Sequence, residues 1–308
     1  MARKRKGDKV DGWINLDKPV GMTSTQAFAK VRRYLNAQKA GHAGTLDPLA
    51  SGILPIALGE ATKTIPYVQD SLKTYYFAVT WGEERDTDDA EGAVTATSDV
   101  RPTRDQINAV LPRYTGEISQ MPPRYSALKI DGQRAYDLAR AGQDVVLEAR
   151  NVYIEWIELL ETTENTAIFR CFCGKGTYVR SLARDIARDL GTCGYISLLR
   201  RESVGGFTLE SSISLDKLEQ MADSLAALLP LRTALDDIPA LALRSEEVAK
   251  LKSGQSLSFI SRPDFERLTK IGLGGTEIAE ALAVFQDLPV AIVETSGPDV
   301  RPVRVLNL

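Results

Sequence analysis

The sequence predicts an α+β protein with one large domain and a small β-rich C-terminal domain. Its 308 residues suit this division, and strand-like and helix-like patterns are mixed along residues 11–236. The segment Asp236-Asp237-Ile238-Pro239 then marks a boundary, beyond which the apolar runs 290–293 and 303–306 are punctuated by turns. We therefore expect a disordered basic tail at residues 1–10, a large domain at 11–236 and a small domain at 237–308.

The expected elements of the large domain follow from local patterns. Thr23 and Gln26 have the spacing of a capping box at the start of a helix. Ser214 stands where a helix N-cap is expected, and Gly191 where a helix ends. Residues 75–81 are aromatic and β-branched, which favours a strand. The expected strands are 12–16, 75–81, 152–160 and 166–173, the expected helices are 104–111, 135–141, 178–190 and 215–229, and the expected loops are 41–51 and 83–92.

Composition excludes several classes of protein. His42 is the only histidine, so a multi-histidine metal site is excluded, and a Ser-His-Asp triad would have to use it. Three sparse cysteines favour a reducing cytoplasm over a disulfide scaffold. The basic N-terminus has no apolar segment behind it, and no apolar run reaches about eighteen residues, so we expect neither a signal peptide nor a membrane span. Residues 174–177 and 86–91 fail the Walker A and calcium-loop patterns, so no nucleotide cofactor and no metal are expected.

Charge is distributed unevenly along the chain. The net charge is −3, yet residues 1–60 carry ten Lys/Arg against five Asp/Glu, and residues 165–201 carry seven against two. Residues 202–308 carry ten against sixteen. Because salt screens charges beyond about 8 Å, local charge matters more than the sum. The two basic segments either form a phosphate-binding face for a nucleic acid or are scattered surface charge.

Asp47 is the first candidate for chemistry. It lies in the loop Gly41-His42-Ala43-Gly44-Thr45-Leu46-Asp47-Pro48-Leu49-Ala50-Ser51-Gly52, before a proline that favours extended backbone. The glycines allow a substrate to approach the backbone closely. A carboxylate held there is suited to act as a nucleophile, whereas the alternative is an aspartate that caps a turn.

Two further segments allow two interpretations each. Arg180 follows a Gly-Lys-Gly turn at the start of a helix, where it either holds a catalytic carboxylate or pairs with Asp185 at the surface. Arg184 and Arg188 continue its face and either meet phosphates or form salt bridges with interleaved aspartates. Tyr75 shares one strand face with Phe77 and either stacks on an extruded base or packs in the core.

Five linked motifs across residues 11–207 together resemble the bacterial tRNA pseudouridine-55 synthases. The motifs are Gly12-Trp13-Ile14-Asn15-Leu16-Asp17-Lys18-Pro19 with Gly21-Met22-Thr23-Ser24, the loop 41–52, the acidic loop 86–92, the segments 120–129 and 132–136, and the arginine motif 174–181. The resemblance implies a pseudouridine synthase fold, namely a mixed, mainly antiparallel sheet flanked by helices, with a C-terminal RNA-binding domain of the PUA type. It also implies an RNA-gripping insertion at about residues 120–150.

The resemblance also implies the function and the roles of residues. Asp47 is the implied nucleophile, Arg180 its partner, and Tyr75 the residue against the target uracil. His42, Tyr178 and Leu199 are implied to shape the uridine pocket, with Lys18 nearby. The implied substrate is the T-arm stem-loop of transfer RNA, bound by a monomer, in which a flipped uridine 55 is isomerised without a cofactor. From the residues alone, an RNA-binding chaperone without chemistry and a small-molecule hydrolase using Asp47 and His42 remain alternatives.

Overall fold

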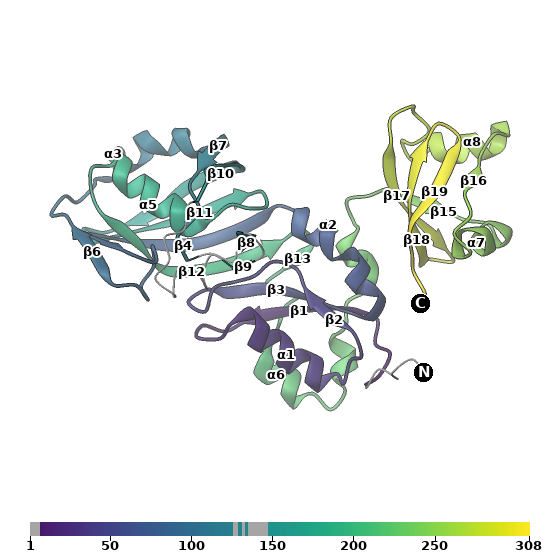
Figure 1. Cartoon of the computed structure of the whole chain (residues 1–308), viewed down its shortest axis with the longest axis horizontal. Helices are drawn as coiled ribbons and strands as arrows, with labels where there is room; N and C mark the ends of the chain where they lie inside the picture. The colour runs from purple at the N-terminus through teal and green to yellow at the C-terminus, as the bar shows by residue number, and fades with distance from the viewer. Residues whose placement is uncertain (1–6, 126–128, 131–132, 135–146) are drawn as a thin grey trace.

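The computed structural model describes residues 7–125, 129–130, 133–134 and 147–308, which form two large β-sheets flanked by helices and two small two-stranded sheets (Figure 1). The expected helix at 135–141 and much of the expected insertion at 120–150 lie outside these residues. Order in the described chain begins before residue 11. Asp8 pairs with Ala37 in an isolated bridge, and Val10 is buried.

The larger sheet has ten strands and is mixed but mainly antiparallel, as expected. Its order is β14-β1-β3-β12-β4-β11-β10-β7, with β2 beside β3 and β13 beside β12. The pairs β1–β14 and β3–β12 are parallel and the rest antiparallel. Its strands are β1 (Gly12–Lys18), β2 (Ala40–His42), β3 (Ser51–Leu58), β4 (Lys73–Trp81), β7 (Gly116–Gln120), β10 (Arg150–Thr162), β11 (Thr166–Cys173), β12 (Gly194–Val204), β13 (Phe207–Thr208) and β14 (Ile213–Ser214).

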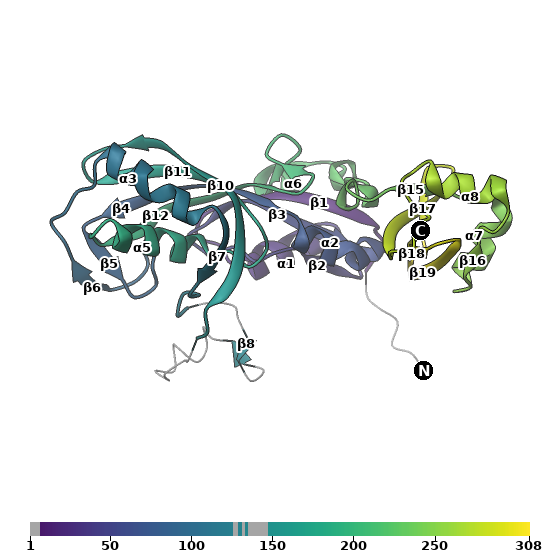
Figure 2. The same cartoon turned by 90° about the horizontal axis from the view of Figure 1, so that it is seen from above.

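Helices flank this sheet in two groups (Figures 1 and 2). Helices α1 and α6 pack together beside β1, while α3 and α5 lie over β10, β4 and β12. The helices of this part are α1 (Ser24–Tyr34), α2 (Ile65–Asp70), α3 (Arg104–Val110), α5 (Val179–Asp189) and α6 (Leu215–Gln220), with 3₁₀ turns η1 (Gly59–Thr64), η2 (Leu111–Tyr114), η3 (Ser224–Ala227) and η4 (Leu231–Ala234). Two short hairpins, β5 (Glu83–Arg85) with β6 (Val94–Thr97) and β8 (Lys129–Ile130) with β9 (Gln133–Arg134), lie outside the sheet.

Strand β4 shows how the sequence pattern builds the core. Its residues alternate between buried and half-buried positions, with Tyr75 and Phe77 on the buried face and Tyr76 on the other. Phe77 stacks on Phe169 of β11 at 5.3 Å between ring centroids. Leu182 and other apolar residues of α5 cover this face. The period of two in the sequence therefore places Tyr75 beside the core rather than on the open face of the sheet.

The second sheet contains five strands in the order β15-β17-β18-β19-β16. Its elements are β15 (Ala240–Ala242), α7 (Ser245–Lys252), β16 (Leu257–Ser258), α8 (Arg262–Thr269), β17 (Ala279–Phe285), β18 (Leu288–Ser296) and β19 (Asp299–Val305). This part of the chain is β-rich, as expected. An apolar set, which we call the interdomain cluster, joins the two sheets; its fully or almost fully buried members include Trp13, Val68 and Leu235 from the larger part and Leu282, Ile292 and Leu306 from the smaller.

Local signals predicted helix starts better than helix ends. Thr23 forms the capping box with Gln26, and the Ser214 side chain accepts a hydrogen bond from the Lys217 amide, which confirms both N-caps. The helix expected at 215–229 is wrong in its length, because α6 ends at Gln220. Asp223 caps the separate turn η3 by accepting from the Leu225 amide, a local hydrogen bond that competes with helix continuation.

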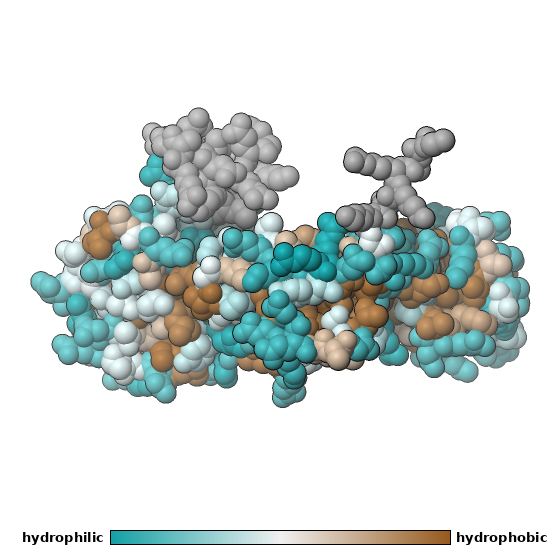
Figure 3. Space-filling model, turned by 90° about the horizontal axis from the view of Figure 1, so that it is seen from below, coloured by the Kyte–Doolittle hydropathy of each residue, from teal (hydrophilic) through white to brown (hydrophobic). Residues whose placement is uncertain are grey.

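The surface seen from below carries apolar areas interrupted by hydrophilic residues (Figure 3). Among the helices that the structure describes, none combines the length and apolar character needed to span a membrane.

Candidate active site

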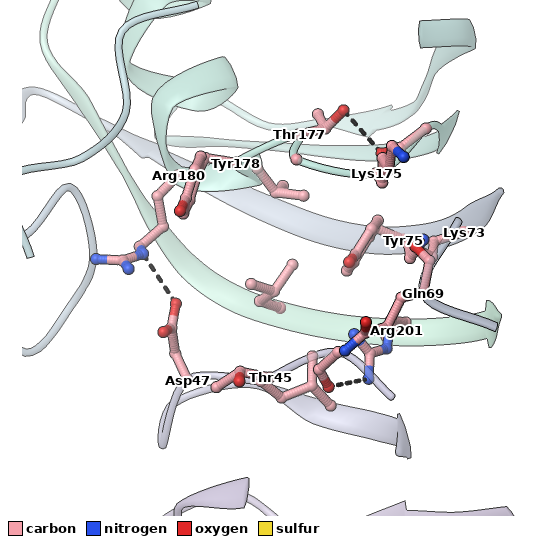
Figure 4. Close-up of a pocket in the computed structure, with 16 residues that line it drawn as sticks. Thr45, Asp47, Gln69, Lys73, Tyr75, Lys175, Thr177, Tyr178, Arg180 and Arg201 are labelled. Carbon is pink, nitrogen blue, oxygen red and sulfur yellow. Dashed lines mark hydrogen bonds and ion pairs between the residues drawn. The ribbon is translucent and has the colours of Figure 1, made fainter. Parts of the chain in front are cut away.

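A pocket of about 340 Å³ lies where the loop 43–50 meets β4, β12 and the start of α5 (Figure 4). We call residues 43–50 the catalytic loop, after the role that the sequence resemblance implies for Asp47. Glycines at positions 174 and 176 bring the turn between β11 and α5 to the same rim. The residues that line the pocket are Gly44, Thr45, Leu46, Asp47, Gln69, Lys73, Tyr75, Gly174, Lys175, Gly176, Thr177, Tyr178, Val179, Arg180, Leu199 and Arg201.

Asp47 sits at one end of this pocket with its side chain 39% exposed. The catalytic loop is fixed to the start of α1, because Ser24 Oγ accepts from the Leu46 amide at 2.8 Å and donates to the Leu46 carbonyl at 2.9 Å. The Gly21 amide also donates to the Pro48 carbonyl. Backbone contacts on both sides of Asp47 therefore hold its carboxylate at the pocket mouth rather than in a simple turn cap.

Arg180 is the buried partner of Asp47. Its Nε lies 2.9 Å from Asp47 Oδ2, and its Nη1 lies 3.5 Å from Asp89 Oδ2. Nη1 and Nη2 also donate to the carbonyls of Thr87 and Tyr125 at 2.8 Å. The surface pair with Asp185 is not formed, since Asp185 pairs with Arg184 instead. With only 6% of its side chain exposed, the guanidinium has one fixed orientation toward the pocket.

The next two arginines of α5 form internal salt bridges. Arg184 is buried and lies 2.9 Å from Asp88, and Arg188 lies 2.7 Å from Glu84. Burial raises the pKa of Asp88 to about 6, although the Arg184 charge opposes this. Arg184 therefore pairs with buried Asp88 and with the interleaved Asp185, whereas Arg188 is 55% exposed and pairs with Glu84 at the surface.

Three other residues implied by the resemblance also line the pocket: Tyr75, Tyr178 and Leu199. Tyr75 is 9% exposed, and burial raises the pKa of its hydroxyl, whereas the Arg201 charge acts in the opposite direction. Tyr178 is the N-cap of α5. Gln120 holds it by accepting from the Tyr178 amide at 2.8 Å and donating to the Tyr178 carbonyl at 3.1 Å.

Lys18 and His42 do not line the pocket. Lys18 is fully buried, and its Nζ donates to the carbonyls of Pro19 and Met22. Burial lowers the pKa of Lys18 to about 8, with the Asp47 charge acting in the opposite direction. His42 lies on β2 with its ring 6.0 Å from that of Phe28. Burial, followed by the Arg201 charge, lowers the pKa of His42. Neither side chain lines the pocket, but Lys18 lies near enough to Asp47 for the two charges to interact.

Sequence reasoning missed several residues of the site. Arg201 and Lys73 line the pocket although both are almost fully buried, and Asp89 contacts Arg180 from the acidic loop. Lys73 was detectable, because it stands two positions before Tyr75 and thus on the same strand face. Arg201 had no comparable local signal. Its burial depends on β12 pairing with both β3 and β4.

Comparison with protein families identifies the class of this fold and site. Residues 32–179 match the family described as TruB family pseudouridylate synthase (N terminal domain). The match includes the catalytic loop, β4 and Tyr178 at the N-cap of α5. The protein class is therefore that of the pseudouridylate synthases.

Whole-length relatives give the particular family. The chain is 52% identical over its full length to the tRNA pseudouridine synthase B of Bradyrhizobium diazoefficiens, of which it covers 91%. It is 48% identical to that of Caulobacter vibrioides, with full coverage of both chains. The crystal structure of a Cbf5-Nop10-Gar1 complex contains a chain with 28% identity and a TM-score of 0.72, covering 96% of this chain and 84% of that one. The chain belongs to the TruB family of pseudouridylate synthases.

Proposed function

We propose that this protein is a tRNA pseudouridine synthase that isomerises uridine 55 in the T loop, with Asp47 as the nucleophile. The relatives named tRNA pseudouridine synthase B support the activity and the transfer RNA substrate. The observation that carries the proposal is the pair of Asp47 and Arg180 at 2.9 Å in a pocket that Tyr75 also lines. The T arm as the recognised element, the monomeric state and the cytoplasmic location are parts of the proposal.

The reaction suits a site built from one carboxylate. The bond between the ribose and a ring nitrogen is broken, and a bond from the same ribose carbon to a ring carbon is formed. The ring carbon loses the proton that it carried and the released ring nitrogen gains one, so atoms and electrons balance and no oxidant, reductant or external energy source is consumed. Asp47 is exposed enough to reach a bound nucleotide, while Arg180 orients it and offsets its charge.

The uridine must leave its stack to reach Asp47. Flipping a nucleotide out of a folded loop costs a few kcal/mol. Stacking of a base on an aromatic ring recovers about 1–3 kcal/mol. Tyr75 and Tyr178 are the two aromatic residues that line the pocket; we propose that Tyr75 lies against the uracil and that Tyr178 and Leu199 shape the pocket around it. We propose that Lys18 and His42 support the catalytic loop from behind.

Asp47→Asn tests the proposal. We expect pseudouridine formation in a T-arm stem-loop to fall by at least about 10³-fold, because the amide is no longer an anionic nucleophile. RNA binding should persist, since Arg180 and the pocket walls remain. Asp105→Asn, an equivalent change on the exposed first turn of α3, is the control and should retain full activity.

The other outcomes identify the alternatives. Pseudouridine formation by Asp47→Asn at the rate of the unchanged protein would remove Asp47 as nucleophile. If the protein and all its variants bind the RNA but none forms pseudouridine, the protein is an RNA-binding chaperone. Failure to bind RNA in a gel-shift assay would indicate a small-molecule hydrolase.

A further inference from the structure

Arg201 is a buried arginine of strand β12 that lines the active-site pocket. It is 1% exposed and lies on β12, yet it is one of the pocket-lining residues. Its neighbour Arg200 lies on the opposite face of the same strand, where it pairs with Asp17 at 2.7 Å and is 32% exposed. The strand register confirms the opposite orientations, because Arg201 pairs with Tyr75 of β4 and Arg200 with Tyr76.

The guanidinium of Arg201 donates hydrogen bonds to the backbone on both sides of Asp47, inside the catalytic loop and in β3. Its Nη2 donates to the Gly44 carbonyl at 3.1 Å, three residues before Asp47, and its Nε donates to the Ile53 carbonyl at 2.7 Å, just after the loop. It also lies beside Tyr75, its partner across the β12–β4 pair, and its charge opposes the rise that burial causes in the pKa of Tyr75. Figure 4 shows Arg201 between Tyr75 and Thr45, at the opposite end of the pocket from Arg180.

The surrounding backbone leaves little freedom for this arrangement. Gly44 has φ +82°, and a Cβ built on it would lie 3.2 Å from Arg201 Nη1. Gly52 has φ +102°, and its Cβ would lie 2.1 Å from the Arg201 carbonyl oxygen. The two glycines that bracket the loop are thus in contact with one residue, through its side chain and its backbone respectively.

The electrostatic environment of Arg201 is unusual for a structural arginine. Among the described residues, no carboxylate forms an ion pair with its guanidinium. A buried charge without a counter-ion is expensive unless hydrogen bonds satisfy it, and such exceptions concentrate at functional sites. Its charge also acts on Lys73 of the same pocket. Burial is the main cause that lowers the pKa of Lys73 to about 8, and the Arg201 charge is the second.

We propose that Arg201 is a positioning residue for the isomerase reaction. It fixes the catalytic loop, and with it Asp47, relative to the tyrosine on which the flipped base lies. This inference rests on the proposed function. It assigns to Arg201 no contact with the nucleotide, so it predicts a loss in the chemical step and little loss in RNA binding.

Arg201→Lys is the main test. Lysine keeps the charge, but its single nitrogen cannot span the Gly44 and Ile53 carbonyls as the guanidinium does. We expect kcat on a T-arm stem-loop to fall by about 10²-fold, because a misplacement near 1 Å costs that much, while KM and the dissociation constant change by less than about threefold. Arg200→Lys, the same change one residue earlier on the opposite face, is the control and should leave kcat within about twofold of the unchanged protein.

Two further variants keep the test decisive if Arg201→Lys folds poorly. Gly44→Ala places a methyl group against the guanidinium and should lower kcat without altering the dissociation constant. In a double-mutant cycle, Arg201→Lys and Gly44→Ala should be non-additive in kcat, because both disturb the contact between the guanidinium and Gly44. If Arg201 only stabilised the fold, the variants would instead contain a smaller fraction of active enzyme. The activity losses of the two single variants would then multiply in the double variant.

The outcomes separate this inference from the proposed function. If the unchanged protein forms no pseudouridine, the proposed function fails. If it is active and Arg201→Lys and Gly44→Ala both retain kcat within about threefold, or if their losses appear mainly in RNA affinity, the positioning role is wrong.

Discussion

At the scale of single residues, the site depends on charges that burial has perturbed. Lys18 has no exposed surface, yet its Nζ is satisfied by two carbonyls at the end of β1. Its pKa falls to about 8 because burial disfavours the ammonium form. Such a group links the stability of the fold to pH in the range where the protein is handled.

The Lys18 pKa gives a prediction about stability. Its value in the folded state, about 8, lies below the ordinary 10.5, so between these values the unfolded chain binds more protons. The contribution of Lys18 to the free energy of unfolding is therefore fully present above about pH 10.5, where the side chain is neutral in both states. It is lost as the pH falls through about 8, because the buried amine then becomes charged. Lys18→Met should show a flatter dependence of the free energy of unfolding on pH across this window than the unchanged protein.

Denaturant titrations at several pH values check this prediction. Lys250→Met, on the exposed face of α7, is the control and should keep the slope of the unchanged protein. Equal slopes for Lys18→Met and the unchanged protein would show that the ammonium of Lys18 is not desolvated in the folded state.

At the scale of elements, α5 organises the site through three arginines spaced four residues apart. Arg180, Arg184 and Arg188 all pair with carboxylates of the acidic segment 83–92, at Asp89, Asp88 and Glu84 respectively. Arg180 alone also reaches the catalytic loop. The helix thus joins the acidic segment to Asp47, and the Arg184–Asp88 pair is the buried support behind that connection.

Arg184→Met tests the strength of this support. At about pH 7.5 the change leaves the Asp88 carboxylate buried without its partner, and breaking a buried pair in this way costs about 3–5 kcal/mol. We expect the free energy of unfolding in urea to fall by that amount. Adding Asp88→Asn should recover part of the loss, because the remaining side chain is neutral and Asn tolerates the positive φ of position 88. A loss below about 1 kcal/mol would show that the pair is screened by water.

Features were predictable from the sequence when they depend on residues close together along the chain. Local signals gave the capping box at Thr23, the alternation of β4 and the helix start near Arg180, because each depends on residues a few positions apart. The motif resemblance added the fold and most of the pocket. Neither gave Arg201, whose burial depends on strands far apart in the chain. Nor did they show that Lys18 and His42 stand outside the pocket lining, since sequence order does not fix which side chains face a cavity.

At the scale of the whole molecule, the two sheets share apolar surface. The interdomain cluster places Leu306, near the end of β19, with Trp13 of β1 and Val68 of α2. Tyr67 of α2 adds a hydrogen bond to Glu280 of β17 at 2.9 Å. Cores that interlock in this way favour cooperative unfolding of both parts, because neither can lose its structure without exposing the surface of the other.

Leu306→Ala tests that coupling. Removing a fully buried leucine costs about 2–5 kcal/mol, and here the loss falls on the contact between the sheets. Calorimetry of the unchanged protein should show one transition, whereas Leu306→Ala should broaden it or split it into two. Leu268→Ala, a fully buried change within the smaller core alone, is the control. Two transitions in the unchanged protein would show that the cluster does not couple the sheets.

Because of where the three tryptophans lie, intrinsic fluorescence can follow the unfolding of each region without an added label. Trp13 is fully enclosed in the interdomain cluster, Trp81 is 3% exposed at the far end of β4, and Trp156 is 37% exposed on β10. Emission from an enclosed indole moves to longer wavelength when water reaches it. Separation of the sheets would therefore change the Trp13 signal while Trp81 still emits as a buried chromophore, so single-tryptophan versions of this chain would report on each region in turn.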